Sequence, residues 1–495
     1  MKKYIGVDLG TSSVKLLLVS RDGHIEKTAA EEYPLVFPEP GWSEQDPVQW
    51  WEAFCRALKS LLKDVDVSEI SAIGTAGQMH GLVVLDKDDN VIRPAILWND
   101  SRSQAEVDYL NNEIGKQRLS KLTGNIAFAG FTAPKLLWMK KHEHDNFYRI
   151  RKIMLPKDYI NYRLTGAHVT DYSDASGTLL LDVENRKWSE EMMEICEVTY
   201  DRLPVLHESH EVIGTVRKKV AGELGLPEGV KVVAGAGDNA AAALGTGVAG
   251  GGLCNISLGT SGTIFISSDT FRVDPENALH SFAHADGGYH LMGCILSAAS
   301  CNKWFYEDIM GTNEYEKVWK NINLGSLGRN SVFFLPYLMG ERSPINDTDV
   351  RGTFVGLSMA TTKYDMAQAI MEGVAFALRD CLEVAQAQGI QVYRSFFCGG
   401  GAKSELWRRI ICNVLKIDLD IPGTEAGPGM GAAMLAMVGD GAYDSVSSCM
   451  EEVCFVKKSE EVKPELAAMY DQQYAKFKLI YPSVREMYRN FRILG

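Results

Sequence analysis

The sequence predicts an α/β protein with two similar domains that flank a central cleft. A chain of 495 residues exceeds what one hydrophobic core usually supports, so two domains or more are expected. Short apolar segments are followed by glycine-containing turns and then by helical segments, the order typical of α/β folds. The tetrapeptide Leu-Gly-Thr-Ser occurs at residues 9–12 and again at 258–261, each time between two apolar segments. Such an internal repeat indicates two domains of like fold.

The first repeat lies at the tip of a predicted hairpin with strands at residues 4–7 and 14–19. Its turn offers backbone N–H groups and hydroxyls that can hold a phosphate. Asp8, at the end of the first strand, suits a hydrated magnesium ion. A plain turn uses the same residue types, so this hairpin alone does not decide the matter. The second hairpin, at residues 254–267, has Ser257 in the place of Asp8, and the two tips together favour phosphates held from both sides of a cleft.

After the first hairpin, Asp46 and Pro47 form a helix start signal, and a strand is predicted at residues 70–76. This strand and a further predicted hairpin, at residues 82–97, both end in polar side chains. These are Gln78, His80, Trp98, Asn99, Asp100 and Arg102. Because they supply donors, acceptors and an aromatic ring, they suit a polyhydroxylated ligand. Two ordinary polar loops are the alternative.

The central segment, residues 231–247, follows two predicted helices (130–142 and from 155 onward) and a predicted polar loop at 171–177. It contains a short apolar strand, a glycine turn and a helix that starts at Asp238. Gly235 and Gly237 allow a ligand to approach the backbone closely. Asp238 then stands where a strand ends and a helix begins, with its carboxylate directed into the crevice above the sheet. The alternative role is a helix cap, since Asp is a preferred N-cap residue.

Residues 235–240 also fit the pattern G-x-G-x-x-A, which binds dinucleotides when it joins a strand to a helix. Two details oppose that function. The carboxylate of Asp238 would face the pyrophosphate and repel it. The pattern also requires an acidic residue about 20 positions further on to hold the ribose, and residues 239–268 contain no Asp or Glu. Nicotinamide binding is therefore disfavoured.

The second half continues with alternating strands and helices, including a long helix at about residues 364–388. A strand at 395–398 leads into the glycine-rich turn 399–404, which we interpret as a floor for adenine or ribose. Close packing of strand against helix is the alternative. We predict domains at residues 1–246 and 247–440, with the glycines at 250–252 as a hinge, and a helical tail at 441–495.

The composition disfavours several classes of partner and suggests a compartment. The net charge of −13 disfavours nucleic acid and anionic membranes as partners. The 10 cysteines include no C-x-x-C pair, which removes support for a zinc site and fits a reducing cytoplasm. Asp8 interrupts the first apolar run, so the start does not resemble a signal peptide. No apolar run is long enough to cross a bilayer.

With these motifs placed, the chain resembles the FGGY carbohydrate kinases, in the superfamily of actin, hexokinase and the ATPase domain of heat-shock chaperones. The resemblance covers nearly the whole chain and is strongest to the xylulokinase subgroup. The matching motifs are residues 77–81 (Gly-Gln-Met-His-Gly), 97–100 (Leu-Trp-Asn-Asp), 130–135 (Gly-Phe-Thr-Ala-Pro-Lys), 155–158 (Leu-Pro-Lys-Asp), 237–241 (Gly-Asp-Asn-Ala-Ala), 335–338 (Leu-Pro-Tyr-Leu) and 340–342 (Gly-Glu-Arg). The Met-His-Gly stretch bears most on the sugar, because glycerol kinases differ there.

The resemblance implies two ribonuclease-H-like domains, MgATP in the cleft between them and a sugar deep in the N-terminal domain. It implies ATP-dependent phosphorylation of D-xylulose on its 5-hydroxyl, with Asp238 as the general base. The residues that would bind the sugar are Met79, His80, Gly81, Trp98, Asn99, Asp238 and Asn239. Those that would bind the nucleotide are Thr11, Ser12, Gly259, Thr260, Ser261, Gly400, Gly401 and Ala402. Asp8 and Asp238 would reach Mg²⁺ through water.

Three other functions remain as alternatives at this point. A kinase for ribulose, another ketose or a polyol would share the same motifs. An actin-like ATPase would share the duplicated hairpins, although no separate peptide-binding domain is evident in the sequence. A sugar-binding regulator without catalysis is disfavoured by the presence of both Asp8 and Asp238. Because some relatives are dimers, a homodimer is an assembly to test.

Overall fold

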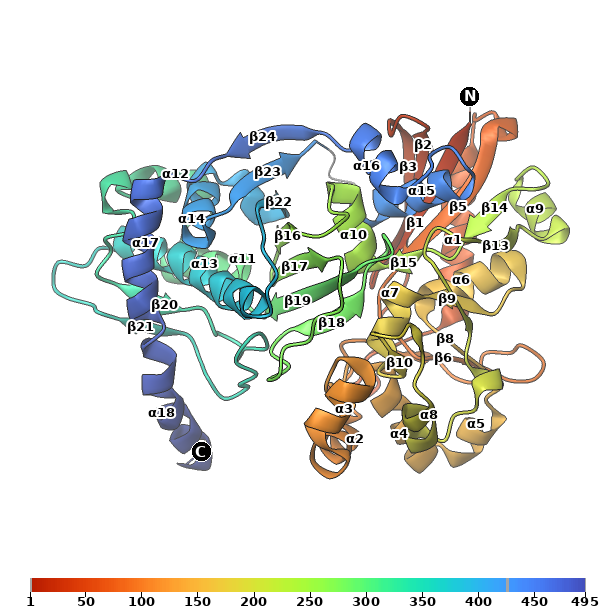
Figure 1. Ribbon diagram of the computed structural model, residues 1–495, viewed down its shortest axis with the longest axis horizontal. Helices are drawn as coiled ribbons and strands as arrows, with labels where there is room; N and C mark the ends of the chain where they lie inside the picture. The colour runs from red at the N-terminus through yellow and green to blue at the C-terminus, as the bar shows by residue number, and fades with distance from the viewer. Residues whose placement is uncertain (1, 424–426, 495) are drawn as a thin grey trace.

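Two seven-stranded sheets organise the computed structural model, which describes residues 2–423 and 427–494 (Figure 1). The predicted first domain starts at residue 1 and the predicted tail ends at residue 495. Both of these residues lie outside the described ones. The first sheet has the order β13-β14-β5-β1-β2-β3, with β15 beside β5, and the second has the order β18-β19-β17-β16-β22-β23-β24. The first sheet comprises β1 (Lys3–Leu9), β2 (Ser13–Ser20), β3 (Ile25–Glu32), β5 (Ile70–Gly77), β13 (Val212–Thr215), β14 (Lys231–Val233) and β15 (Ala236–Gly237). The second comprises β16 (Leu253–Leu258), β17 (Gly262–Ser268), β18 (His280–Ala283), β19 (Tyr289–Ile295), β22 (Arg394–Cys398), β23 (Asp418–Pro422) and β24 (Val456–Glu460).

Both sheets contain the same central arrangement, which confirms the predicted α/β fold with two similar halves. In the first, β1 pairs antiparallel with β2 and parallel with β5. In the second, β16 pairs antiparallel with β17 and parallel with β22. The hairpin tips differ in length, because Leu9 pairs with Val14 whereas Leu258 pairs with Gly262. The tip of the first repeat is therefore one residue longer.

Helices cover both faces of the sheets. The longer helices are α1 (Pro47–Leu62), α4 (Thr132–His142), α6 (Pro156–Thr165), α10 (Asp238–Thr246), α13 (Lys363–Ala387), α14 (Glu405–Leu415), α15 (Gly427–Gly439), α17 (Pro464–Phe477) and α18 (Ile480–Leu494). The side chain of Asp46 caps α1 by accepting a hydrogen bond from the backbone N–H of Val48 at 2.9 Å, as its start signal predicts. Helices α1 and α6 pack on the first sheet, and α13 and α14 pack on the second.

Helices α10 and α15 lie against each other between the two sheets (Figure 1). Their backbones touch at glycines: a Cβ atom on Gly431 would lie 1.9 Å from the carbonyl oxygen of Ala241. Helix α15 also packs on β1 and β5, where a Cβ on Gly6 would lie 2.0 Å from the carbonyl oxygen of Gly429. A helix from the segment 247–440 thus covers a face of the first sheet.

Three segments differ from the expected local structure. Residues 82–97 keep two bridges of a hairpin, but β6 (Val83–Leu85) pairs mainly with β8 (Lys152–Met154), and β7 (Ala95–Ile96) pairs with β4 (Glu44–Gln45). Pro94, which lacks an N–H, interrupts the expected pairing. Residues 171–177 are a buried helical segment that includes α7 (Tyr172–Ala175) instead of a polar loop. Within the tail predicted to be helical, residues 456–460 form β24 and extend the second sheet.

No helix among residues 2–423 and 427–494 is both long and apolar enough to cross a membrane.

Candidate active site

The predicted base, Asp238, occupies the first turn of α10, directly after the N-cap residue Gly237. Its Oδ1 atom accepts hydrogen bonds from the backbone N–H of Asn239 at 2.7 Å and from Asn239 Nδ2 at 3.0 Å. The same amide nitrogen lies 3.8 Å from the sulfur of Met79. The carboxylate is therefore not the helix cap, and three of the predicted sugar ligands lie together.

His80 has a positive φ of 69°, a backbone conformation that non-glycine residues rarely adopt. Several contacts hold it there. Its carbonyl oxygen accepts hydrogen bonds from Lys135 Nζ at 2.9 Å and Thr132 Oγ1 at 3.1 Å. Its ring stacks on Phe131, with 4.8 Å between ring centroids. Unusual backbone geometry that is held from several sides is typical of functional positions.

The imidazole of His80 is held in one protonation state. Its Nδ1 atom lies 2.7 Å from the carbonyl oxygen of Gly177, an acceptor, so this nitrogen carries the proton. Burial, with smaller contributions from the charges of Lys135 and Arg342, lowers the pKa of His80 to about 3, against the opposing bond to Gly177. A neutral imidazole with Nδ1 protonated presents Nε2 as an acceptor for a sugar hydroxyl.

The other polar residues at the strand ends divide into two groups. Trp98 is 45% exposed, and its indole N–H donates to Thr11 Oγ1 at 3.0 Å, which links it to the first hairpin tip. Asn99 is exposed, and Gly81 packs on Pro156. In contrast, Asp100 and Arg102 form a buried ion pair of 2.7 Å. Gln78 is buried and bonds to Gln45 Oε1 at 3.0 Å. These last three, expected among ligand-binding polar groups, instead stabilise the fold.

Two acidic residues share the centre of the site. Burial, with a smaller contribution from the charge of Asp8, raises the pKa of Asp238 to about 7, against the opposing hydrogen bond from Asn239. Burial also raises the pKa of Asp8 to about 6, opposed by the charge of Lys15. Two carboxylates that disfavour each other's charge create a site where a cation is stabilising.

The donor set fits a magnesium ion that is bound mainly through water and phosphate. No group of three or more His, Cys, Asp or Glu side chains suited to a metal occurs in the part of the chain that the structure describes. Mg²⁺ typically keeps several waters and uses one or two carboxylates together with substrate phosphates. Asp8 and Asp238 supply that number of carboxylates.

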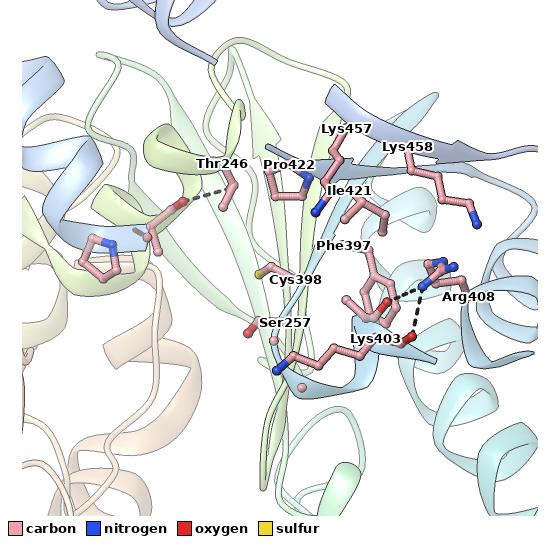
Figure 2. Close-up of a pocket in the computed structure, with 16 residues that line it drawn as sticks. Thr246, Ser257, Phe397, Cys398, Lys403, Arg408, Ile421, Pro422, Lys457 and Lys458 are labelled. Atoms are coloured by element: carbon pink, nitrogen blue, oxygen red, sulfur yellow. Dashed lines mark hydrogen bonds between the residues drawn. The ribbon is translucent and has the colours of Figure 1, made fainter. Parts of the chain in front are cut away.

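A cavity of about 700 Å³ lies between α10 and the second sheet (Figure 2). Its lining residues are Ala242, Thr246, Ser257, Phe397, Cys398, Gly399, Gly400, Ala402, Lys403, Arg408, Ile421, Pro422, Gly427, Pro428, Lys457 and Lys458. Three lysines, Lys403, Lys457 and Lys458, border a largely apolar floor (Figure 2). This combination suits a flat ring with an attached polyphosphate.

The glycine-rich turn after β22 lines the cavity and also packs closely on the second sheet. Gly400 and Ala402 line the cavity, as the sequence predicts for nucleotide ligands. Gly401 is buried, and a Cβ atom there would lie 2.8 Å from Leu258 Cβ, so it provides close packing. Lys403 also lines the cavity; it belongs to the turn 399–404, which the sequence indicates, but it is not among the nucleotide ligands expected from the sequence. Lys457 and Lys458 had no local signal, because they reach the cavity only through the pairing of β24 with β23.

The second hairpin tip is exposed at Gly259, Thr260 and Ser261. The carbonyl oxygen of Thr260 accepts hydrogen bonds from the backbone N–H of Ala298 at 3.0 Å and from Ser300 Oγ at 2.7 Å. At the first tip, the carbonyl oxygen of Thr11 accepts one from Gln45 Nε2 at 2.6 Å, while Ser12 is exposed. Both tips are therefore anchored through carbonyl groups.

A buried ionic cluster is connected by hydrogen bonds to the segment that carries Asp238. Lys157 is inaccessible to solvent, and its ammonium lies 2.6 Å from Asp158, 2.9 Å from Asp171 and 3.6 Å from Asp174. Asp171 also accepts a hydrogen bond from Ser173, whose hydroxyl oxygen accepts the N–H of Gly237 at 3.1 Å. The cluster thus fixes the residue that precedes Asp238.

Comparisons with known proteins bear on the family and on the fold. Residues 3–245 match the N-terminal domain, and residues 254–439 the C-terminal domain, of the FGGY family of carbohydrate kinases. Xylulose kinase of Escherichia coli (strain K12) is 40% identical over 480 residues, which cover 97% of this chain and 98% of the relative. The crystal structure of ligand-bound xylulose kinase from Lactobacillus acidophilus is similar with a TM-score of 0.93 and 27% identity, covering 99% and 100% of the two chains. Gluconate kinase from Lactobacillus acidophilus is similar with a TM-score of 0.93 and 28% identity, covering 99% of each chain.

Proposed function

Because this chain belongs to the FGGY family of carbohydrate kinases and is an ATP-dependent sugar kinase, we propose that its substrate is D-xylulose. The reaction would be D-xylulose + MgATP → D-xylulose 5-phosphate + MgADP. The observation that carries the proposal is the contact of Asn239 with both Asp238 and Met79, with His80 beside Met79 at Gly177. The relative from Escherichia coli, a xylulose kinase, supports the choice of sugar.

We assign the proton transfer to Asp238. Phosphoryl transfer depends on in-line positioning and on neutralisation of charge more than on covalent chemistry. The carboxylate would accept a hydrogen bond from the 5-hydroxyl, orient its oxygen toward the γ-phosphate and take the proton as the new P–O bond forms. An alcohol is too weak an acid to ionise beforehand, so the proton moves late in the step. The helix N-terminus at Asp238 favours the ionised carboxylate.

The nucleotide would occupy the cavity beside α10. Gly400 and Ala402 would contact the base or ribose, while the lysines that line the cavity, Lys403, Lys457 and Lys458, would favour an anionic ligand. The hairpin tips, at Thr11–Ser12 and at residues 259–261, would supply N–H and hydroxyl donors. Asp8 and Asp238 would hold Mg²⁺ through water, and the ion would neutralise charge on the phosphates when bound. The sugar side would be the domain of residues 1–246 and the nucleotide side that of residues 247–440.

A panel of acceptors tests the proposed substrate. ADP release would be measured by a coupled assay with D-xylulose, L-xylulose, D-ribulose, L-ribulose, glycerol, gluconate and no acceptor. We expect turnover with D-xylulose to exceed the others by at least about tenfold, because hydrogen-bonding sites reject analogues that leave buried groups unpaired. Stronger turnover with gluconate or ribulose would show that D-xylulose is not the substrate, while the proposed mechanism would still apply to the preferred acceptor. ATP hydrolysis that is indifferent to every acceptor would contradict sugar phosphorylation by this site.

The pH dependence of the reaction should report the carboxyl of Asp238. The base must be ionised to accept a proton, and the pKa of Asp238 is about 7 in the free protein. We expect kcat/KM for the sugar, which reflects the free enzyme, to fall below pH 7 and to approach a tenfold loss per pH unit. Bound Mg²⁺ favours the ionised form, so higher metal concentrations should shift the midpoint downward. A flat profile between pH 5.5 and 8 would contradict the assignment.

A further inference from the structure

Arg342 reaches the sugar site from the opposite half of the molecule. It follows β20 (Phe333–Leu335) in the second half, yet its guanidinium carbon lies 4.8 Å from the ring centroid of Phe128, in the first half. Phe128 contacts Phe131, whose ring stacks on His80. The guanidinium is therefore at the edge of the aromatic cluster that holds the predicted sugar ligand His80.

Arg342 has no ion-pair partner in the part of the chain that the structure describes. Its Nε atom is buried and has no hydrogen-bond partner within the described ranges 2–423 and 427–494. The neighbouring side chains that its charge affects, His80 and His280, are both held neutral by burial, which lowers their pKa values. By contrast, the buried guanidinium of Arg102 is paired with Asp100 and Glu44. Buried donors are normally satisfied, so an unmatched one at a candidate site indicates a ligand.

The adjacent acid does not neutralise this charge. Burial raises the pKa of Glu341 to about 8, against two backbone hydrogen bonds, so its carboxyl is largely protonated at neutral pH. That carboxyl faces the backbone: Glu341 Oε1 accepts from the N–H groups of Leu296 and Arg342, both at 2.8 Å. The N–H of Ser343 donates to the carbonyl oxygen of Cys294 at 3.0 Å. These bonds fix the backbone of residues 341–343 to the end of β19, so Arg342 is presented from a rigid support.

Stacking on Phe128 leaves the in-plane donors available. A guanidinium on an aromatic ring uses its face, and its N–H groups point outward in the plane. Such a fork suits neighbouring oxygens of a polyhydroxylated molecule. The pKa of Asp238 is governed by burial, Asp8 and Asn239, whereas the charge of Arg342 acts on His80. Arg342 therefore lies nearer to His80 than to Asp238 within the site.

We propose that Arg342 binds the sugar, donating hydrogen bonds to the oxygens at the end remote from the hydroxyl that is phosphorylated. The half of the molecule that carries the nucleotide cavity then completes the sugar site in the other half. This inference rests on the proposed function, since it assigns a binding residue for the same acceptor.

Replacement of the guanidinium should weaken sugar binding selectively. For Arg342→Gln we expect the KM and the calorimetric Kd for D-xylulose to rise about 10- to 100-fold, because a charge-assisted hydrogen bond is lost. The KM for ATP should stay within about twofold. Arg342→Lys keeps the charge but loses the planar set of N–H donors. Its KM for D-xylulose should therefore lie between those of Arg342→Gln and the wild type. Arg351→Gln is the matched control, because Arg351 is exposed on the same connection and its guanidinium donates to the nearby carbonyls of Thr348 and Val350.

A substrate analogue locates the contact. With 1-deoxy-D-xylulose, which lacks the terminal oxygen remote from the phosphorylated carbon, wild type and Arg342→Gln should differ by less than with D-xylulose. An unchanged KM for sugar, an equal loss in Arg351→Gln, or a loss confined to ATP would each overturn the inference. If wild type rejects D-xylulose but accepts another sugar of the panel, the proposed substrate fails. The same KM comparison, made with the accepted sugar, then still decides the role of Arg342.

Discussion

Asp238→Asn is expected to lose turnover by about 10²- to 10⁴-fold while the protein remains folded. The amide keeps the size and the hydrogen-bond acceptor that Asn239 contacts, but it cannot accept the hydroxyl proton. The measurement is kcat for the preferred sugar, with circular dichroism as a check on the fold. Retention of near-normal turnover would exclude Asp238 as the base.

The same substitution should stabilise the protein above pH 7. The carboxyl has a pKa of about 7 when folded and 3.8 as its ordinary value, so the folded state binds its proton more tightly. The protonated carboxyl of Asp238 therefore contributes its full share to the free energy of unfolding below pH 4, and this contribution is lost as the pH rises through 7. At about 1.4 kcal/mol per pKa unit, removing the buried charge gains up to about 4 kcal/mol at pH 8.

Thermal unfolding without Mg²⁺ at pH 5 and pH 8 measures this gain. The Tm difference between Asp238→Asn and wild type should be larger at pH 8 than at pH 5. Asp145→Asn provides the control, since this carboxylate is fully exposed and its replacement should change Tm little at either pH. Equal Tm shifts at both pH values would show that the buried charge of Asp238 does not destabilise the fold.

Lys157→Met should have the largest effect on stability. The substitution removes the ammonium that Asp158, Asp171 and Asp174 share, all of them buried. Breaking a buried ion pair by removing one partner typically costs about 3–5 kcal/mol, because the other charge stays buried without compensation. Urea unfolding at pH 7.5 should show a midpoint shift of that size.

Lys152→Met is the matched control for Lys157→Met. Lys152 pairs with Asp89 near the surface, where ion pairs contribute about 0–1 kcal/mol. Combining Lys157→Met with Asp171→Asn should recover part of the loss, since one carboxylate is then neutralised. Similar unfolding midpoints for the two lysine variants would refute a structural role for the buried cluster.

The sequence predicted well those features that local signals encode. The strand, glycine turn and helix start at Asp238 depend on neighbouring residues, and so does the repeated hairpin at residues 9–12 and 258–261. Residues 171–177 were wrongly expected to form a polar loop, because the buried Asp171 is stabilised by Lys157 and Ser209, which are distant in sequence. Polar residue type alone does not reveal such a partner.

Position along the chain also grouped side chains that the fold separates. Gln78 and His80 are two residues apart, yet Gln78 turns inward to Gln45 while His80 is held at the site by Gly177. Lys457 and Lys458 reach the nucleotide cavity from a tail that was predicted to be helical. Each of these positions depends on contacts between residues distant in sequence, which no local pattern records.

The return of α15 to the first sheet has a consequence for synthesis of the protein. Helices α1 and α6 can cover one face of β2, β3 and β5 as soon as the N-terminal segment leaves the ribosome. The opposite face stays apolar and uncovered until α15, residues 427–439, has also emerged. We expect the nascent N-terminal half to remain partly folded, with this apolar face exposed to chaperones that hold unfolded chains. Folding of this half should be completed only when translation is nearly complete.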